Sequence, residues 1–278
     1  MSQNKATATI CGVQINLAYK TTLSASLRNY EKDYQNFYAN ALGAQSKVVN
    51  EQGFNVNFAQ RINSKLNYYI ATDFFRFPFK TYISQEGAIG FKIRSEVNYN
   101  PSPTTHLRIT YKFNNREEDV KLNDEKILHY NVLQQIQAYL QTQLTQTLYL
   151  HSRIGYSHTH NYESNTDNGY YFLVEGIYKP NIIPLQLNLR YAYFDTKNYD
   201  NHFSVYEYNL PLNYSTTLFY DKGHRAYIYL KANLFKDIDL SFRYAVTLFS
   251  DKETISSGND EIPHSHKQDI GLQLHIKF

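Results

Sequence analysis

The C-terminal stretch 267-KQDIGLQLHIKF-278 alternates apolar residues with polar residues or glycine. The apolar positions are Ile270, Leu272, Leu274, Ile276 and Phe278. Successive side chains of a β-strand point to opposite faces of the sheet, so this spacing predicts a strand with one apolar and one polar face.

The same alternation recurs along the chain. It covers residues 11–19, 54–62, 89–99, 107–113, 148–156, 185–193, 226–234 and 238–248. These segments are about ten residues long, whereas strands of soluble sheets usually have about five or six residues. A tilted strand of about ten residues is long enough to cross a bilayer.

The strands of a soluble β-sandwich would also alternate between apolar and polar residues. The composition of the polar face must therefore distinguish a sandwich from a membrane-spanning sheet. That face carries Arg, Lys, Glu, His or Gln in almost every segment, while the first face is apolar throughout and consists mainly of Leu, Ile and Tyr. A lipid-facing exterior requires such an unbroken apolar face, and 27 Tyr residues can supply interfacial aromatic girdles. The pattern favours an antiparallel transmembrane β-barrel over a sandwich.

Composition excludes several other classes of protein. With 278 residues, 42% hydrophobic and 19% charged, the chain is not disordered, and a net charge of +3 indicates no dedicated nucleic-acid surface. The single cysteine, Cys11, cannot form an internal disulfide. No run approaches the roughly 18 apolar residues of a spanning helix, and no signal peptide is recognisable at the N-terminus.

The predicted connections alternate between short and long, which is typical of outer-membrane barrels. The short ones are 20–22, 63–65, 100–103, 142–143, 179–184 and 236–237, and the long ones are 31–50, 78–85, 114–125, 157–168, the segment from 195, and 250–267. We expect roughly 13 strands, or 15 if 203–220 forms a spanning hairpin. Because single-chain bacterial barrels have even counts, this predicts a truncated larger barrel, unless the first hairpin in 6–28 is miscounted.

Two segments interrupt the single barrel domain predicted for residues 1–278. Helical spacing followed by Gly43 predicts a short helix in the loop 31–50, which caps the barrel mouth, tucks inside the barrel or is an ordinary external loop helix. The residues at this spacing are Tyr30, Tyr34, Phe37, Tyr38, Ala41 and Leu42. Segment 203–224 is rich in aromatics but contains Pro211, which fits poorly inside a paired strand. It predicts either an inward-folded constriction or a distorted edge hairpin.

Several short stretches resemble those of a known family. They are Tyr38–Gly43, Asn50–Phe54, Asp73–Pro78, Tyr206–Leu210, Tyr220–Arg225 and Ser257–Ile262. On these stretches the chain resembles the C-terminal barrel region of Gram-negative outer-membrane helix-hairpin-helix domain proteins. The resemblance implies an outer-membrane location and a periplasmic helix-hairpin-helix part that this sequence lacks, so it implies no nucleic-acid binding here. Phe278 resembles the C-terminal signal through which barrel-assembly machinery recognises its substrates.

The sequence predicts neither enzymatic activity nor a cofactor. His158 and His160, like His264 and His266, could begin a metal site, but no third ligand is evident, so we expect none. The acidic clusters 117–119 and 259–261 are either a calcium site or, as we expect, solvated loop charge.

The polar face of the strands should line the lumen. The predicted lining residues are Arg61, Lys92, Arg94, Glu96, Arg108, Lys112, Arg153, Arg190, Lys231, Arg243 and Lys277. Basic residues dominate, which predicts a pore or translocation channel for polar or anionic solutes in the outer membrane, in contact with its lipid. The alternatives are a non-conducting barrel whose paired charges fill a plugged interior and which scaffolds partners, and a surface-binding protein that acts through its loops.

Overall fold

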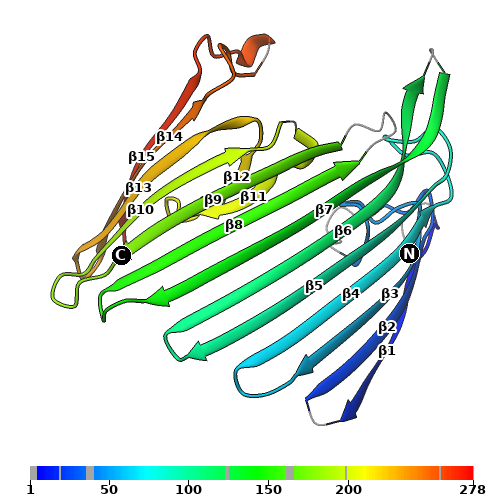
Figure 1. The fold of residues 1–278 in the computed structure, drawn as a ribbon, viewed down its shortest axis with the longest axis horizontal. Helices are drawn as coiled ribbons and strands as arrows, with labels where there is room; N and C mark the ends of the chain where they lie inside the picture. The colour runs from blue at the N-terminus through cyan, green and yellow to red at the C-terminus, as the bar shows by residue number, and fades with distance from the viewer. Residues whose placement is uncertain are drawn as a thin grey trace. The chain divides into compact units, whose positions relative to one another are not determined.

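The computed structural model describes residues 5–18, 20–35, 41–122, 125–160, 166–197, 199–256 and 258–277. Across these residues the chain is built from strands, with two short 3-10 turns at Tyr199–Asn201 and Gly258–Asp260 (Figure 1). The strands are β1 (Ala8–Ala18), β2 (Thr21–Tyr30), β3 (Glu51–Arg61), β4 (Leu66–Phe77), β5 (Ala88–Ser102), β6 (Thr105–Leu122), β7 (Glu125–Gln143), β8 (Leu148–His160), β9 (Thr166–Tyr178), β10 (Leu185–Asp195), β11 (Phe203–Glu207), β12 (Ser215–Phe219), β13 (Lys222–Phe235), β14 (Ile238–Phe249) and β15 (His266–Ile276).

Thirteen of these strands form one antiparallel sheet in which neighbours in sequence are neighbours in space (Figure 1). The order departs from the sequence at one point, where β10 pairs with β13 and leaves β11 and β12 as a separate two-stranded sheet. The all-β antiparallel fold and the count of 13 to 15 strands are confirmed. A closed cylinder is not: the sheet order ends at β1 and β15, so these two strands are open edges among the described residues.

The short connections lie within a few residues of their predicted positions, except that 142–143 belongs to β7 and the turn follows at 144–147. Of the predicted long loops, 157–168 is shorter, because residues 157–160 belong to β8 and 166–168 to β9, and the loop predicted over 114–125 is wrong. Strand β6 instead has 18 residues and ends at Leu122, and strand β7 has 19 residues and begins at Glu125. The charged run there stays extended because its groups have partners: Asp119 N donates to Ile83 O at 2.8 Å, and Asp119 Oδ2 accepts from Gln85 N at 2.7 Å. These polar residues therefore remain in a strand and form hydrogen bonds with the loop that contains Ile83 and Gln85.

The helix predicted in 31–50 is not found in the part of that segment that the structure describes. Residues 31–35 and 41–50 contain turns and bends, and Tyr30, which began the helical spacing, is the last residue of β2. Residues 36–40 lie outside the described residues, as does Phe278, so the aromatic pair Phe37 and Tyr38 and the proposed assembly signal have no structural description.

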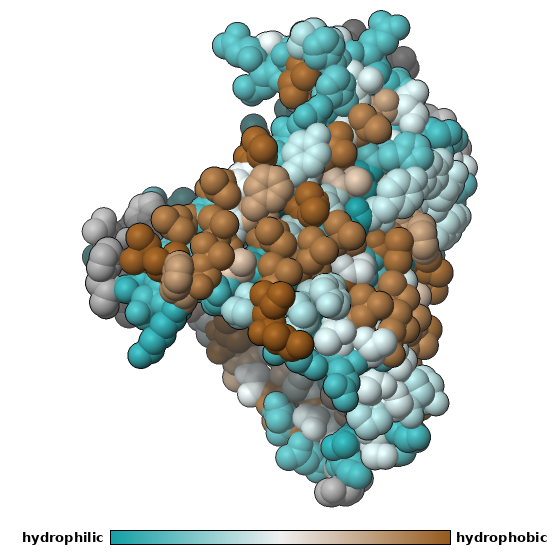
Figure 2. Space-filling model, turned by 90° about the vertical axis from the view of Figure 1, so that its left-hand side faces the viewer, coloured by the Kyte–Doolittle hydropathy of each residue, from teal (hydrophilic) through white to brown (hydrophobic). Residues whose placement is uncertain are grey.

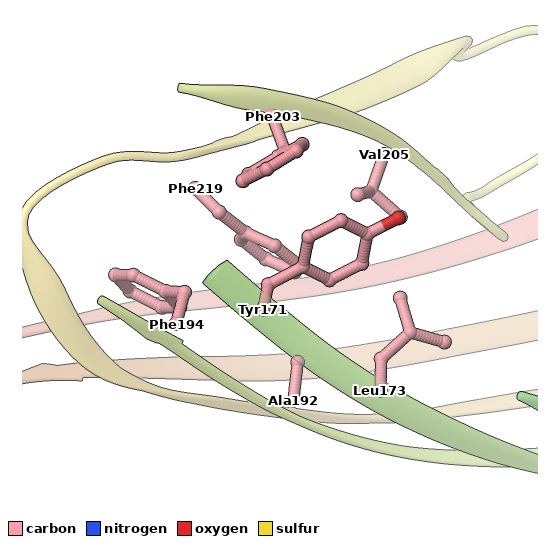
Figure 3. Close-up of a cluster of buried hydrophobic side chains, with 7 residues drawn as sticks. All are labelled: Tyr171, Leu173, Ala192, Phe194, Phe203, Val205 and Phe219. Atoms are coloured by element: carbon pink, nitrogen blue, oxygen red, sulfur yellow. The ribbon is translucent and has the colours of Figure 1, made fainter. Parts of the chain in front are cut away.

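The chain divides into two compact units. Unit 1 comprises Met1–Tyr99, Ile109–Ile136 and Thr159–Thr166, and unit 2 comprises Asn100–Arg108, Gln137–His158 and Asp167–Phe278. In unit 2 the hairpin of β11 and β12, residues 203–219, packs on one face of the main sheet. Figure 3 shows Phe203, Val205 and Phe219 of this hairpin turned toward Tyr171 and Leu173 of β9 and Ala192 and Phe194 of β10. The rings of Phe194 and Phe219 stack with centroids 5.0 Å apart.

The opposite face of the sheet in unit 2 is apolar and uncovered. The exposed fraction is 77% for Ile270 and 69% for Leu272, and Leu189, Leu248 and Leu274 are also exposed. Figure 2, which looks onto the side where β15 and its neighbours lie, shows hydrophobic side chains gathered across the middle and hydrophilic ones toward the ends. A β-sandwich would bury these aliphatic side chains between two sheets, so the sandwich alternative is wrong for the described residues.

Unit 1 likewise exposes apolar side chains on one face of the sheet and buries charged side chains on the other. Leu27, Phe54 and Phe74 are exposed, whereas Arg28 and Glu51 on the other face are buried. Cross-strand pairing fixes this arrangement, because Leu27 pairs with Phe54 and Phe54 with Phe74, so the three side chains share one face. No helix among the described residues is both long enough and apolar enough to span a membrane.

Candidate functional site

Glu175 of β9 is the centre of an ion-paired network on the polar face of unit 2. Its side chain is 1% exposed, and Arg190 Nη2 on β10 lies 2.9 Å from Glu175 Oε2. Asn188 Nδ2 donates to Oε1 at 3.1 Å, the Tyr227 hydroxyl donates to the same oxygen, and His151 Nδ1 lies 3.6 Å from Oε2. Register places these side chains together, since Arg190 pairs directly with both Glu175 and Tyr227.

Glu207, the last residue of β11, attaches the hairpin to the same face. Its carboxylate accepts two hydrogen bonds from Arg225, from Nε at 2.7 Å and Nη2 at 2.9 Å, and a third from Arg243 Nη2 at 2.6 Å. Arg190 Nη1 also donates to the carbonyl oxygen of Tyr206 at 2.7 Å. Three arginines of the main sheet therefore hold the hairpin through one buried carboxylate and its neighbouring backbone.

Burial alone would raise the pKa of Glu207, but the hydrogen bonds and positive charges of Arg225 and Arg243 outweigh it and lower that pKa. A carboxyl group with a folded-state pKa below its unfolded value stabilises the fold above the unfolded value, and this contribution is lost as pH falls through the folded-state pKa. The ordinary value is about 4.3, so we expect the hairpin to stay attached at neutral pH and to detach only below about pH 4. Amide hydrogen exchange of residues 203–219 measured across pH, corrected for the intrinsic exchange rate, checks this. A detachment step near pH 6 would contradict it.

A polar chamber lies between the hairpin, the strands β13 to β15 and the loop 250–262. Its volume is about 670 Å³. Polar and charged lining residues are Asn209, Asn213, Thr216, Thr217, Tyr220, Arg225, Arg243, Thr247, Ser256, Asp260, Lys267 and Asp269. Leu210 closes one side by packing over β15, where a Cβ on Gly271 would lie 2.7 Å from Leu210 Cδ1. The chamber is thus bounded partly by the hairpin that Glu207 attaches.

Unit 1 has its own buried ion triad. Arg28 Nε lies 2.5 Å from Glu51 Oε1, and its Nη1 lies 2.6 Å from Asp73 Oδ1. The free lone pairs of Glu51 accept from Ala44 N at 2.8 and 3.0 Å, and Lys92 Nζ donates to Ala44 O at 2.8 Å. The described part of the loop, residues 41–50, is therefore attached to the polar face much as the hairpin is in unit 2.

The predicted lining residues lie in different environments. By register Arg61, Lys92, Arg94 and Glu96 share the face of Asp73 in unit 1, and Arg94 pairs with Glu96 at 3.0 Å. In unit 2, Arg190, Lys231 and Arg243 share the face of Glu175, Lys277 lies 3.6 Å from Asp239, and Arg153 stacks on the Tyr139 ring at 4.6 Å. Arg108 and Lys112 lie on β6 with exposed side chains.

The residues that hold the two networks together were missed in the sequence. Arg28, Glu51 and Asp73 are not among the predicted lining residues, nor are Glu207 and Arg225. Arg28 carried a usable signal, because it alternates with Leu27 in a strand and therefore had to face the polar side. The signal for Glu207 was weaker, since segment 203–224 was not assigned to a face.

The histidine pairs do not build a metal site in the described residues. His264 and His266 stack with ring centroids 5.4 Å apart, and His158 Nδ1 lies 2.8 Å from Asn168 Oδ1. Among the residues that the structure describes, no group of three or more His, Cys, Asp or Glu side chains is placed to hold a metal ion.

No family model matches the chain, and no curated protein matches it. Solved structures do match. A Pseudomonas aeruginosa FadL homologue is 8% identical, with 96% of this chain and 75% of that chain covered and a TM-score of 0.40. CdiB from Acinetobacter baumannii is 12% identical over 98% of this chain and 50% of that chain, with a TM-score of 0.44. The P. putida toluene transporter TodX is 12% identical over 95% and 79% of the two chains, with a TM-score of 0.35.

These neighbours are outer-membrane β-barrels. Nothing in the comparisons supports the helix-hairpin-helix family that the short stretches resemble. With identities of 8–12% and TM-scores below 0.5, the functional assignment of this chain depends on its own geometry.

Proposed function

We propose that the chain is the wall of an outer-membrane β-barrel channel for polar solutes in a Gram-negative bacterium. The observation that carries this proposal is the inverted sheet: Glu175 and Glu207 are fully buried on one face while Ile270 and Leu272 are largely exposed on the other. In water such an arrangement would expose apolar surface and bury charge, both unfavourable. In a membrane the apolar face contacts lipid and the charged face lines the lumen.

Two further features support membrane insertion. The strands of the main sheet run 10 to 19 residues, long enough to cross a bilayer when tilted. On the apolar face, Tyr170 lies near the start of β9 and Tyr193 near the end of β10, with ring centroids 6.1 Å apart. Both are at the end of the sheet where the long connection after β10 begins. Tyrosines at that depth fit an interfacial girdle.

Leu272→Arg tests which face contacts lipid. A charge facing the bilayer midplane destabilises a membrane barrel by roughly 2 to 4 kcal/mol, so we expect this variant to lose most of its membrane-inserted, folded protein. Folding into lipid vesicles, followed by the β-sheet signal in circular dichroism against urea, measures the loss.

The matched control is Gln273→Arg, one residue along the same strand and on the polar face. We expect it to fold nearly as well as wild type. If Gln273→Arg is the damaging variant instead, the faces are assigned the wrong way round. If both variants fold equally in buffer without lipid, the membrane assignment is wrong.

Planar-bilayer recording of the full-length protein tests the channel. We expect discrete conductance steps, because a polar face lined by charged and amide side chains admits water and ions.

The second candidate, a non-conducting barrel that scaffolds partners, is favoured by one observation: Arg190, Arg225 and Arg243 are all paired and lie under the hairpin. Silence at all voltages would support the scaffold. For either role we propose a non-enzymatic protein that contacts outer-membrane lipid and is assembled through its C-terminal strand.

A further inference from the structure

We infer that the polar chamber of unit 2 binds an uncharged, hydroxyl-rich solute of the saccharide class, which the channel admits in preference to anions. This inference rests on the proposed channel function and narrows its substrate. It also replaces the anion preference that the excess of basic residues suggested, because that count missed Glu207, which pairs with Arg225 and Arg243.

The charges around the chamber cancel. Its basic lining residues are Arg225, Arg243 and Lys267. Glu207 holds both arginines, and the lining adds Asp260 and Asp269, with Asp269 Oδ2 lying 3.9 Å from Arg225 Nη2. Among the described residues, three cations thus face three carboxylates. An anion would have to compete with Glu207 for arginines that are already bonded. A cation that approached Asp260 or Asp269 would also meet the positive charges of Arg225, Arg243 and Lys267.

The remaining polar lining is suited to hydroxyl groups. Asn209 and Asn213 offer amide donors and acceptors, and Thr216, Thr217 and Ser256 offer hydroxyls that do both. A polyhydroxylated solute needs donors and acceptors in this mixture, whereas a hydrocarbon would leave them unpaired. The rings of Tyr220 and Phe249, with centroids 5.9 Å apart, add an apolar wall of the kind on which the C–H face of a sugar ring can rest.

The size and the position of the chamber fit a solute on its way through. About 670 Å³ lies within the usual range for small-molecule sites. The chamber is at the end of the sheet where Asp195 pairs with Lys222 and Gly223 with Phe249, and residues of the connections 196–221 and 250–265 line it. In outer-membrane barrels the longer connections lie on the extracellular side, so an entering solute would reach this chamber early.

Liposome swelling with three probes of one size and different charge tests the inference: glucose, gluconate and glucosamine. We expect glucose to enter faster than either charged probe. Asn213→Leu combined with Thr217→Val removes lining polar groups without touching an ion pair. We expect it to slow glucose about fivefold, as the loss of hydrogen bonds predicts, and to slow gluconate and glucosamine less. The control, Asn181→Leu, lies in the short connection 179–184 and should behave as wild type.

The outcomes separate the two proposals. No swelling with any probe, together with no conductance, would overturn the channel itself. Swelling in which gluconate enters as fast as glucose or faster would leave the channel standing and overturn the saccharide inference. An equal slowing of all three probes in the double variant would also overturn it, because it would show a general structural effect rather than a lost binding site.

Discussion

Glu207→Gln is expected to detach the hairpin of β11 and β12 from the polar face and to raise the single-channel conductance. The substitution keeps the shape of the side chain and removes its charge. Arg225 and Arg243 then remain on the polar face with no carboxylate between them, and both side chains are more than nine-tenths buried. Breaking a buried ion pair by removing one partner destabilises by about 3–5 kcal/mol.

The effect should be confined to the hairpin. Strands β10 and β13 pair with each other directly along eleven residues from Leu185 to Asp195, so the main sheet does not depend on β11 or β12 for its hydrogen bonds. We therefore expect the amides of 203–219 to exchange faster, while those of β10 and β13 stay protected. Hydrogen exchange followed by mass spectrometry resolves the two segments.

The control is Glu261→Gln, which removes an exposed carboxylate in the loop 250–265. It should leave both exchange and conductance unchanged. An unchanged exchange rate in Glu207→Gln would show that the apolar contacts of Phe203, Val205 and Phe219 alone hold the hairpin. In that case the ion pairs would not be the attachment, and the hairpin would be a fixed part of the polar face.

The fold could be predicted because the alternation of apolar and polar residues along a strand is a local pattern that a single sequence displays. Every second residue is apolar from Ile238 to Leu248 in β14 and from Ile270 to Ile276 in β15, and the strand pairing confirms the faces that this alternation predicts. The extension of β6 and β7 could not be predicted in the same way. Residues 114–119 are polar on both faces, and the hydrogen bonds of Asp119 that keep them extended go to Ile83 and Gln85, more than thirty positions away.

The candidate site was harder to predict for a related reason. Basic residues of the polar face could be assigned to it individually, but their partners could not. Glu207 belongs to a strand outside the main sheet, and its contact with Arg243 spans 36 positions. Net charge of a lumen depends on such pairs, so a list of inward-facing arginines overestimates the positive field.

Arg28→Met is expected to have a comparably large effect in unit 1. The arginine lies between two carboxylates, with side-chain exposure of 1% for Arg28 and 0% for Glu51, so its removal leaves Glu51 and Asp73 without their ion-pair partner. We expect a loss of about 3–5 kcal/mol in urea unfolding from lipid vesicles. The loop 41–50 should detach as well, because Glu51 also accepts the amide of Ala44. Trypsin should then cut after the exposed Lys47 faster than in wild type.

Two further variants identify the cause. Arg94→Met removes an arginine from the same face, but that side chain is 52% exposed and its pair with Glu96 should contribute only about 0–1 kcal/mol. Gly53→Ala keeps every charge and instead crowds the site, since a Cβ at Gly53 would lie 2.3 Å from Arg28 Cζ. If the alanine variant loosens the loop 41–50 as the methionine variant does, the bidentate geometry of the guanidinium is what matters, and not its charge alone. If Arg94→Met is as damaging as Arg28→Met, burial of the triad is not what stabilises unit 1.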